Sequence, residues 1–126
     1  MIMKTNKLFL SITLFLFVIA TNVNAQSLEG YTYQSTVDGV SLYYKVGEYG
    51  ITFKIKNERN KMVHVKIYNV TSQWSDNRTR TKDVEITYIP DGKIRGGSYD
   101  HSDNYSKMVG KWSFDNWKWS EKREDL

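Results

Sequence analysis

The chain has 126 residues and contains no cysteine and a single proline. Without cysteine it forms no disulfide, carries no thioether-linked lipid and offers no thiol nucleophile. A domain of this length must therefore be stabilised by its hydrophobic core alone. The length suits one compact domain and is too short for two.

Leucine and alanine are scarce outside the first 25 residues. Beyond them the sequence has no alanine and only three leucines, Leu28, Leu42 and Leu126, whereas 15 aromatic residues remain. The apolar residues of this part are mostly valine, isoleucine, tyrosine and tryptophan, which favour strands over helices. We therefore predict an all-β domain.

The first 25 residues have the three-part layout of a secretory signal peptide. Residues 1–7 hold Lys4 and Lys7 and no acid, residues 8–20 form a thirteen-residue apolar stretch, and small side chains precede a cleavage position after Ala25. A helix of that length rises only about 20 Å, against about 30 Å of hydrocarbon. We therefore expect a cleaved signal peptide, residues 1–25, a secreted or periplasmic protein, and no stable membrane span after cleavage.

The positive charge is concentrated in this segment. The whole chain has a formal charge of +4, but residues 26–126 carry 16 basic and 14 acidic side chains. A net charge of +2 argues against a dedicated nucleic-acid binder, and export separates the protein from most nucleic acid. We expect no nucleic-acid partner.

Three stretches of the mature sequence alternate apolar and polar residues with a period of two: 40–46, 51–55 and 63–67. Turn sequences at 47–50 and 57–60 separate them. This pattern predicts a three-stranded antiparallel meander with one apolar face. The outward face would carry the solubilising side chains of Lys54, Lys56 and Lys66, and His64 is also expected to point outward.

The next segments are less regular. Residues 71–82 show almost no periodicity and are predicted to form a long surface loop or a ragged edge. Residues 84–88 alternate again, and the Pro-Asp-Gly turn within residues 89–93 predicts a hairpin to a strand over residues 94–99. Gly96 and Gly97 are expected to mark a bulge in that strand.

With a short strand at residues 31–36 and a last strand at 111–119, the chain has about seven predicted strands. No predicted helix is available to cover a sheet, so two packed sheets are favoured over one open sheet. We predict an immunoglobulin-like antiparallel β-sandwich over residues 26–120, without the cysteine pair of antibody domains, followed by a charged tail, residues 121–126.

The last predicted strand has an unusual aromatic cluster. Trp112 and Phe114 share one strand parity, and Trp117 and Trp119 share the other, so a regular strand would expose one pair. One interpretation is a stacking platform for sugar rings, with polar contacts from Asp115, Asn116 and Lys118. The other is a bulge or turn at Asp115 and Asn116 that resets the register and lets all four aromatic side chains enter the core.

A second candidate surface is basic. Arg78, Arg80 and Lys82 fall at alternating positions and would suit acidic glycans or lipid phosphates. The simpler interpretation is a solvated loop. The candidate binding residues are thus eight: Trp112, Trp117, Trp119, Asp115, Asn116, Arg78, Arg80 and Lys82.

Motifs for catalysis and for metal binding are missing. The sequence has no nucleophile elbow, no glycine-rich phosphate loop and no paired histidines on a helix, so we expect no catalytic residues and no cofactor. The oxygen-rich stretch at residues 100–104 lacks the spacing of an EF-hand loop, so no metal site is predicted.

These observations favour a small secreted binding or interaction module for a protein or glycan of the cell envelope. The alternative is a structural or accessory envelope subunit that docks through a sheet edge. A small glycan-active enzyme or inhibitor is a third interpretation. The sequence contains no motif that indicates the oligomeric state or identifies the ligand.

Overall fold

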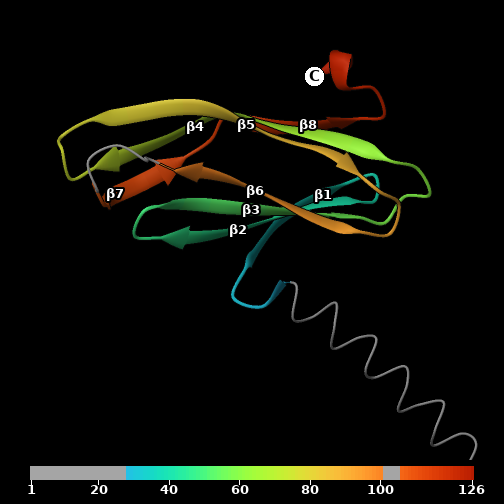
Figure 1. The fold of residues 1–126 in the computed structure, drawn as a ribbon, viewed down its shortest axis with the longest axis horizontal. Coiled ribbons are helices and arrows are strands. Elements are labelled where there is room, and N and C mark those ends of the chain that lie inside the picture. Colours follow the sequence, from blue (N-terminus) through green and yellow to red (C-terminus); the bar gives the residue numbers. More distant parts are fainter. Residues whose placement is uncertain (1–27, 101–105) are drawn as a thin grey trace, which may run out of the picture. The chain divides into compact units, whose positions relative to one another are not determined.

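A computed structural model describes residues 28–100 and 106–126. The chain divides into two units, residues 1–30 and 31–126, and the expected signal peptide lies outside the described residues. The second unit is all-β (Figure 1). Its strands are β1 (Thr32–Val37), β2 (Val40–Gly47), β3 (Gly50–Asn57), β4 (Val63–Trp74), β5 (Thr79–Ile89), β6 (Ile94–Asp100), β7 (Met108–Ser113) and β8 (Asn116–Ser120).

The strands form two antiparallel sheets, which Figure 1 shows as two layers. Sheet A has the order β1-β2-β3-β6, and sheet B has the order β5-β4-β7, with β8 also paired to β4. The expected all-β, two-layer antiparallel architecture is confirmed. The described residues contain eight strands and not seven, because the predicted last strand is divided into β7 and β8.

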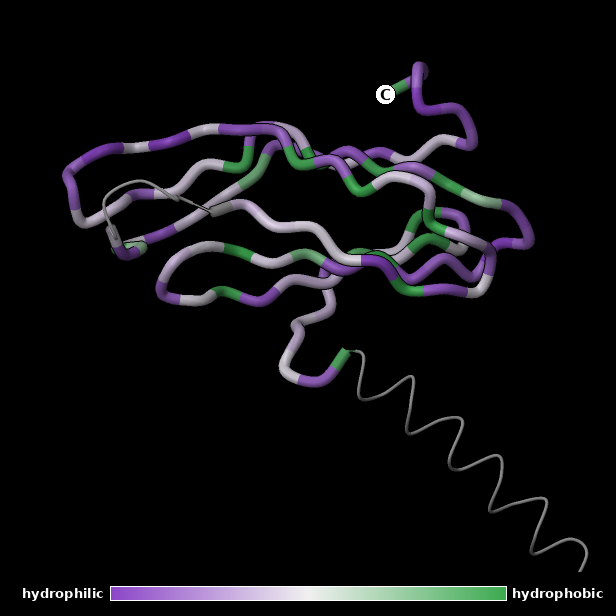
Figure 2. Tube along the Cα trace, in the orientation of Figure 1, coloured by the Kyte–Doolittle hydropathy of each residue, from purple (hydrophilic) through white to green (hydrophobic). Residues whose placement is uncertain are grey.

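The core lies between the sheets and follows from the period of two. In β3 every second side chain is buried, from Ile51 to Asn57. Figure 2 shows hydrophobic stretches within the strands and hydrophilic stretches at the turns and near the C-terminus. The largest fully buried apolar side chains come from both sheets: Leu42, Ile51, Phe53 and Ile55 from sheet A, and Ile67, Trp74 and Ile89 from sheet B.

The predicted three-stranded meander is wrong. β3 pairs with β2 and β6, whereas β4 belongs to the other sheet, so Lys66 lies on a different face from Lys54. Residues 58–62 connect β3 in sheet A to β4 in sheet B. Fully buried Asn57 stabilises this connection, because its side-chain amide donates to the carbonyls of Lys61 at 2.8 Å and Ile89 at 3.1 Å. The alternation identified the buried faces correctly, but it does not specify which strands pair.

Residues 71–82, predicted as a loop, form the paired ends of β4 and β5. Thr71 pairs with Thr81 and Ser72 with Arg80, and a turn at residues 75–78 joins the strands. The backbone N–H of Trp74 donates to the carbonyl of Arg78 at 3.0 Å. Buried and less buried side chains still alternate here, with Ser72 and Trp74 at buried positions. Because these two residues are not aliphatic, the alternation could not be recognised from the sequence.

The Pro-Asp-Gly turn forms as expected, with Gly92 at φ 69° and the N–H of Lys93 bonded to the carbonyl of Pro90. It does not close a hairpin, because it leads from β5 in sheet B to β6 in sheet A. The predicted bulge at Gly96 and Gly97 is absent, since both residues pair regularly with β3. A Cβ at Gly97 would lie 2.7 Å from Cγ1 of Ile86, so this glycine permits the close approach of β6 to β5.

His64 is on the outward side of β4, as expected, but it is only 4% exposed. A bulge in β5 places Tyr88 at φ 56°, and the Tyr88 ring covers the imidazole at 4.8 Å between ring centroids. The N–H of Tyr88 donates to Nδ1 of His64 at 3.0 Å. The outer face of sheet B is therefore partly covered.

The C-terminal segment contains a short 3₁₀ helix, η1 (Arg123–Asp125). The Arg123 guanidinium donates a 3.0 Å hydrogen bond to Glu85, and this bond, with the attraction of the carboxylate, raises the pKa of Arg123. No helix among residues 28–100 and 106–126 is long and apolar enough to cross a bilayer.

Candidate functional site

The break between β7 and β8 determines where the aromatic cluster points. Both strands pair with the same edge of β4, β7 from Thr71 to Trp74 and β8 from His64 to Tyr68. Between these stretches Asn69 has φ 54° and forms a bulge in β4. The N–H of Asp115 donates to the carbonyl of Tyr68 at 3.0 Å, which holds the break against the bulge.

Because the register is reset at this break, the four aromatic side chains all pack against the core. Trp112 and Phe114 precede it and Trp117 and Trp119 follow it, and each is half-buried. This arrangement corresponds to the bulge interpretation of the cluster and differs from a regular strand with one exposed pair.

The two later tryptophans join the sheets. The Trp117 indole N–H donates to the hydroxyl of Ser35 and the Trp119 indole N–H donates to the carbonyl of Val37, each at 2.9 Å. The Arg59 guanidinium also lies 4.5 Å from the centre of the Trp119 ring. Both rings thus help to close the sandwich along β1, and with Val37, Asp38 and Lys118 they also line a shallow hollow of about 260 Å³.

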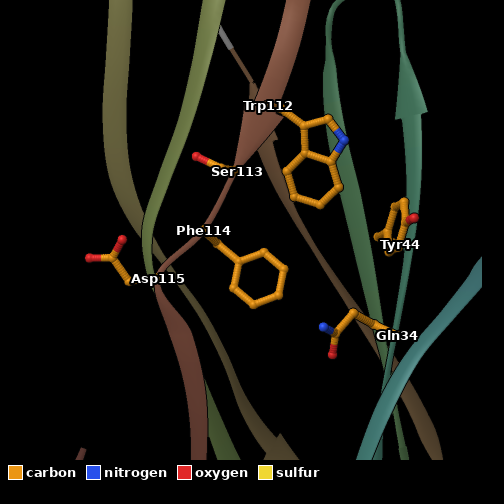
Figure 3. Close-up of a pocket in the computed structure, with 6 residues that line it drawn as sticks. All are labelled: Gln34, Tyr44, Trp112, Ser113, Phe114 and Asp115. Atoms are coloured by element: carbon orange, nitrogen blue, oxygen red, sulfur yellow. The ribbon is translucent and has the colours of Figure 1, made fainter.

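An open pocket of about 500 Å³ lies beside the earlier pair. Figure 3 shows the rings of Trp112 and Phe114 on the side of β7 that faces Tyr44 and Gln34, whereas the side chains of Ser113 and Asp115 point the other way. The pocket is thus formed by sheet A and sheet B together, at the edge where β1 and β2 meet β7. Its lining residues are Gln34, Tyr44, Trp112, Ser113, Phe114 and Asp115.

The aromatic wall of the pocket is fixed by ring packing. Trp112 and Phe114 are stacked at 5.9 Å and 26°, and Tyr44 meets Trp112 edge-on at 5.0 Å. Trp112 also contacts fully buried Phe53, with the ring centroids 6.0 Å apart. The wall is therefore anchored in the core and presents rigid ring surface to the pocket.

The polar side of the pocket comes from β1. Tyr33 pairs with Tyr43 and Ser35 with Leu42, so Gln34 is an extra residue, a bulge on an edge strand. This bulge places the exposed Gln34 amide opposite Phe114 (Figure 3). Sequence reasoning missed both Gln34 and Tyr44, because a bulge in a short strand has no sequence marker and Tyr44 fits the core pattern.

Among the predicted site residues only Trp112 and Asp115 line this pocket. Exposed Asn116 begins β8, and Lys118 lies 5.8 Å from the Tyr68 ring on the outer face of sheet B. The basic residues are elsewhere: Arg78 belongs to the turn between β4 and β5, and Arg80 and Lys82 line a separate hollow of about 260 Å³ with Thr81 and Tyr99. The predicted contact surface is therefore spread over several separate places.

No cluster of three or more histidine, aspartate or glutamate residues suited to a metal ion occurs among residues 28–100 and 106–126. Most of the oxygen-rich stretch at residues 100–104 lies outside the described residues. No family model, curated protein or solved structure matches the chain.

Proposed function

We propose that this protein is a glycan-binding module and that the pocket between Gln34, Tyr44 and the Trp112–Phe114 pair holds the sugar. The observation that carries the proposal is the aromatic wall of Trp112 and Phe114 opposite the exposed amide of Gln34, whose oxygen accepts a hydrogen bond from the Ser35 hydroxyl. Pyranose rings present C–H groups on their faces and hydroxyls on their edges. A ring seated in the pocket would stack on the aromatic wall and bond to the Gln34 amide and the Tyr44 hydroxyl.

The size and openness of the site favour a short stretch of a longer chain. Its volume of about 500 Å³ falls in the usual range for small-ligand sites, about 300–1,000 Å³. Since the pocket is a hollow at the edge of the two sheets, a glycan could enter and leave along the surface. A module of this kind would hold an envelope or extracellular polysaccharide near the protein.

Binding is favoured over hydrolysis because of the carboxylates. Glycoside hydrolysis ordinarily needs a pair of carboxyl groups about 5–10 Å apart that face the sugar. Asp115 is the one acidic residue that lines the pocket, and its side chain points away from the rings toward Asn69 (Figure 3). A glycan-active enzyme is therefore the weaker proposal.

The test uses the intrinsic tryptophan emission of the purified protein, because Trp112 lies in the pocket. Titration with cellohexaose, chitohexaose, laminarihexaose and mannohexaose is expected to give saturable quenching with at least one of them. Gln34→Ala should weaken that binding at least fivefold without changing the melting temperature. Gln73→Ala, an exposed glutamine of β4 outside the pocket, is the matched control. Failure of all four sugars, or equal effects of both variants, would contradict the proposal.

We infer an immunoglobulin-like sandwich from the strand order. β3 and β6 are neighbours in sheet A, and the strands that follow them, β4 and β7, are neighbours in sheet B. In an immunoglobulin domain strands B and E, and the following strands C and F, have the same relationship. This interlocked pair supports the fold proposal, and a crystal structure without β3-β6 pairing would contradict it.

The alternative function, docking through a sheet edge, has one supporting feature. β1 pairs with β2 only as far as Tyr44, so β2 extends beyond its neighbour over Lys45 to Gly47. A partner strand added there would extend sheet A. Replacing Val46 with proline should abolish such docking and leave binding of sugars in the pocket unchanged.

A further inference from the structure

The edge strand β1 lies beside the segment formed by β7 and β8, residues 108–120, and the two meet along a seam. In β1, Ser35 pairs with Leu42 and Val37 with Val40, and both partners are fully buried. Residues directly opposite each other in an antiparallel sheet project to the same side. Ser35 and Val37 therefore point to the side of sheet A that faces sheet B.

The two sides of the seam run in the same direction. Gln34 lies opposite Phe114 (Figure 3), and the next residue, Ser35, accepts the indole hydrogen bond of Trp117. Two residues further along β1, the carbonyl of Val37 accepts the indole hydrogen bond of Trp119. The aromatic cluster thus follows β1 from one end of the strand to the other.

Two hollows lie along this seam, one on each side of the hydrogen bond between Trp117 and Ser35. The pocket of about 500 Å³ contains Gln34, and the smaller one, of about 260 Å³, contains Val37 and Asp38. We name the smaller one the Val37 hollow. Since a strand advances about 3.3 Å per residue, the Cα atoms of Gln34 and Asp38 are about 13 Å apart or less.

The two hollows are built from the same kinds of side chain. Each combines two aromatic rings of the β7–β8 segment with one polar side chain from β1 or from the turn that follows it. The polar groups are the Gln34 amide in the pocket and the Asp38 carboxylate in the Val37 hollow. The ring pairs are Trp112 with Phe114 in the pocket, and Trp117 with Trp119 in the Val37 hollow.

The backbone holds Asp38 in place and leaves its carboxylate to a ligand. Asp38 has φ 48°, and its carbonyl accepts a 3.0 Å hydrogen bond from the Arg59 guanidinium. The carbonyl of the next residue, Gly39, accepts a 2.9 Å bond from the N–H of Glu58. Within residues 28–100 and 106–126 the carboxylate itself has no hydrogen-bond or ion-pair partner.

The Gln34 amide is oriented by the same seam. Its oxygen accepts a hydrogen bond from the Ser35 hydroxyl, which in turn accepts the indole N–H of Trp117 at 2.9 Å. The amide NH₂ group therefore remains for a ligand. The pocket offers a donor at Gln34 and the Val37 hollow an acceptor at Asp38, and sugar hydroxyls suit both because a hydroxyl donates and accepts.

We propose that the seam is one binding cleft for a neutral linear polysaccharide, with the pocket and the Val37 hollow as two subsites. One sugar ring stacks in the pocket, and a later ring of the same chain packs against Trp117 and Trp119 and donates a hydroxyl hydrogen bond to Asp38. This inference rests on the proposed function and adds the class of glycan, an extended neutral chain.

The charges at the subsites favour a neutral chain over an acidic one. Asp38 and Asp115 are the acidic residues that line them, and Lys118 is the one basic residue. The Lys118 ammonium lies on the outer face of sheet B, away from the seam. Arg59 lies over Trp119 without lining the hollow, and its guanidinium is 3.7 Å from Glu121.

An extended peptide fits the seam less well than a polysaccharide. A peptide that adds to an edge strand depends on free backbone N–H and C=O groups along that strand. On β1 the carbonyl of Val37 is already bonded to Trp119, and the bulge at Gln34 interrupts the ladder. A sugar chain relies on ring stacking and side-chain hydrogen bonds, which the seam supplies.

The experiment compares chain lengths by calorimetry of the purified protein with the di- and hexasaccharides of the cello, chito, laminari and manno series. A hexasaccharide that spans both subsites should bind at least tenfold more tightly than the disaccharide of its series. Asp38→Gly removes the carboxylate and suits the positive φ. It should weaken hexasaccharide binding at least fivefold and change disaccharide binding less than twofold.

Asp91→Gly is the matched control, because Asp91 is also an exposed aspartate that precedes a glycine in a turn, and it lines neither subsite. It should change the binding of neither sugar by more than twofold. If Asp38→Gly lowers the melting temperature, Asp38→Asn keeps the size of the side chain and should still weaken hexasaccharide binding at least twofold. Gln34→Ala should weaken the binding of both lengths.

The outcomes separate this inference from the proposed function. Equal affinity for the two lengths, or equal effects of the two aspartate variants, would overturn the two-subsite cleft and leave the pocket as a sugar site. Tighter binding of hexagalacturonate than of the neutral hexasaccharides would overturn the neutral class of ligand. No binding in any of the four series would overturn both proposals.

Discussion

The side-chain amide of Asn69 donates a 2.6 Å hydrogen bond to the carboxylate of Asp115, although 46 residues separate them in the sequence. The bond joins the bulge in β4 to the break between β7 and β8. The N–H of Asn69 also donates to Asp83 of β5 at 2.8 Å, so this residue bonds to both neighbours of β4, the strand β5 and the break between β7 and β8. The register on which the aromatic pocket depends is set here.

Substitutions at Asn69 should separate the contribution of this bond from that of the backbone. Asn69→Gly retains the positive φ and loses the bond, and should lower the free energy of unfolding by about 1 kcal/mol. Asn69→Ala adds left-handed strain and should lower it by about 2 kcal/mol. Urea denaturation measures both. Asn77→Gly, at an exposed turn residue with φ 64°, is the control and should have little effect.

Trp117 should behave as a structural residue. Trp117→Ala is expected to lower the free energy of unfolding by about 3 kcal/mol, because a half-buried ring that packs against the core is removed. Trp117→Phe keeps an aromatic ring and loses the hydrogen bond to Ser35, for a loss of about 1 kcal/mol. A double-mutant cycle with Ser35→Ala measures that bond. Loss of sugar binding by Trp117→Ala at unchanged stability would favour the platform interpretation instead.

The close approach of β6 to β5 gives a third prediction. Gly97→Ala should destabilise the protein by about 2 kcal/mol, because the new Cβ would lie 2.7 Å from Ile86. Gly96→Ala is the matched control, since its Cβ would come no closer than 3.4 Å to the carbonyl of Phe53. Thermal denaturation measures these losses of stability. In a protein that already carries Ile86→Ala, Gly97→Ala should destabilise less than in the wild type. If the destabilising effects of the two substitutions were additive, that result would count against direct contact between the two residues.

The expected signal peptide gives a fourth prediction. When the full chain is expressed in a bacterium, mass spectrometry of the envelope and medium fractions should find a mature protein that begins at Gln26. Ala25→Leu should retain the longer precursor, because the cleavage position requires a small side chain. An uncleaved wild-type chain in the cytoplasm would contradict the proposed signal peptide.

The burial pattern of the sheets was largely predictable, and the strand partners were not. Alternation located β2, β3 and the first half of β4, and it assigned Leu42, Phe53 and Val65 correctly to the core. The strand partners could not be predicted, because a turn sequence such as residues 58–62 is compatible with a return to the same sheet and with a connection to the other sheet. Buried Asn57 at the end of β3 donates to the carbonyls of Lys61, in this turn, and of Ile89, at the end of β5 in the other sheet, and these contacts are visible only in three dimensions.

The candidate pocket was only partly predictable for a related reason. The aromatic cluster identified Trp112 and Phe114, but the partner residues Gln34 and Tyr44 are distant in sequence and come from the other sheet. The turn at Asp38 and Gly39, with φ 48° and 84°, is a strong hairpin signal that fixes β1 against β2. Nothing local predicts the bulge at Gln34 four residues earlier.

The position of β4 has a consequence for how the protein folds. One edge of this strand is covered only by β7 and β8, which come after residue 107. During synthesis that edge stays open until nearly the whole chain has emerged, and folding must then form contacts of high sequence separation. In the interval the exposed edge is a template for intermolecular pairing, so slow folding and a dependence on holding chaperones are expected of this domain.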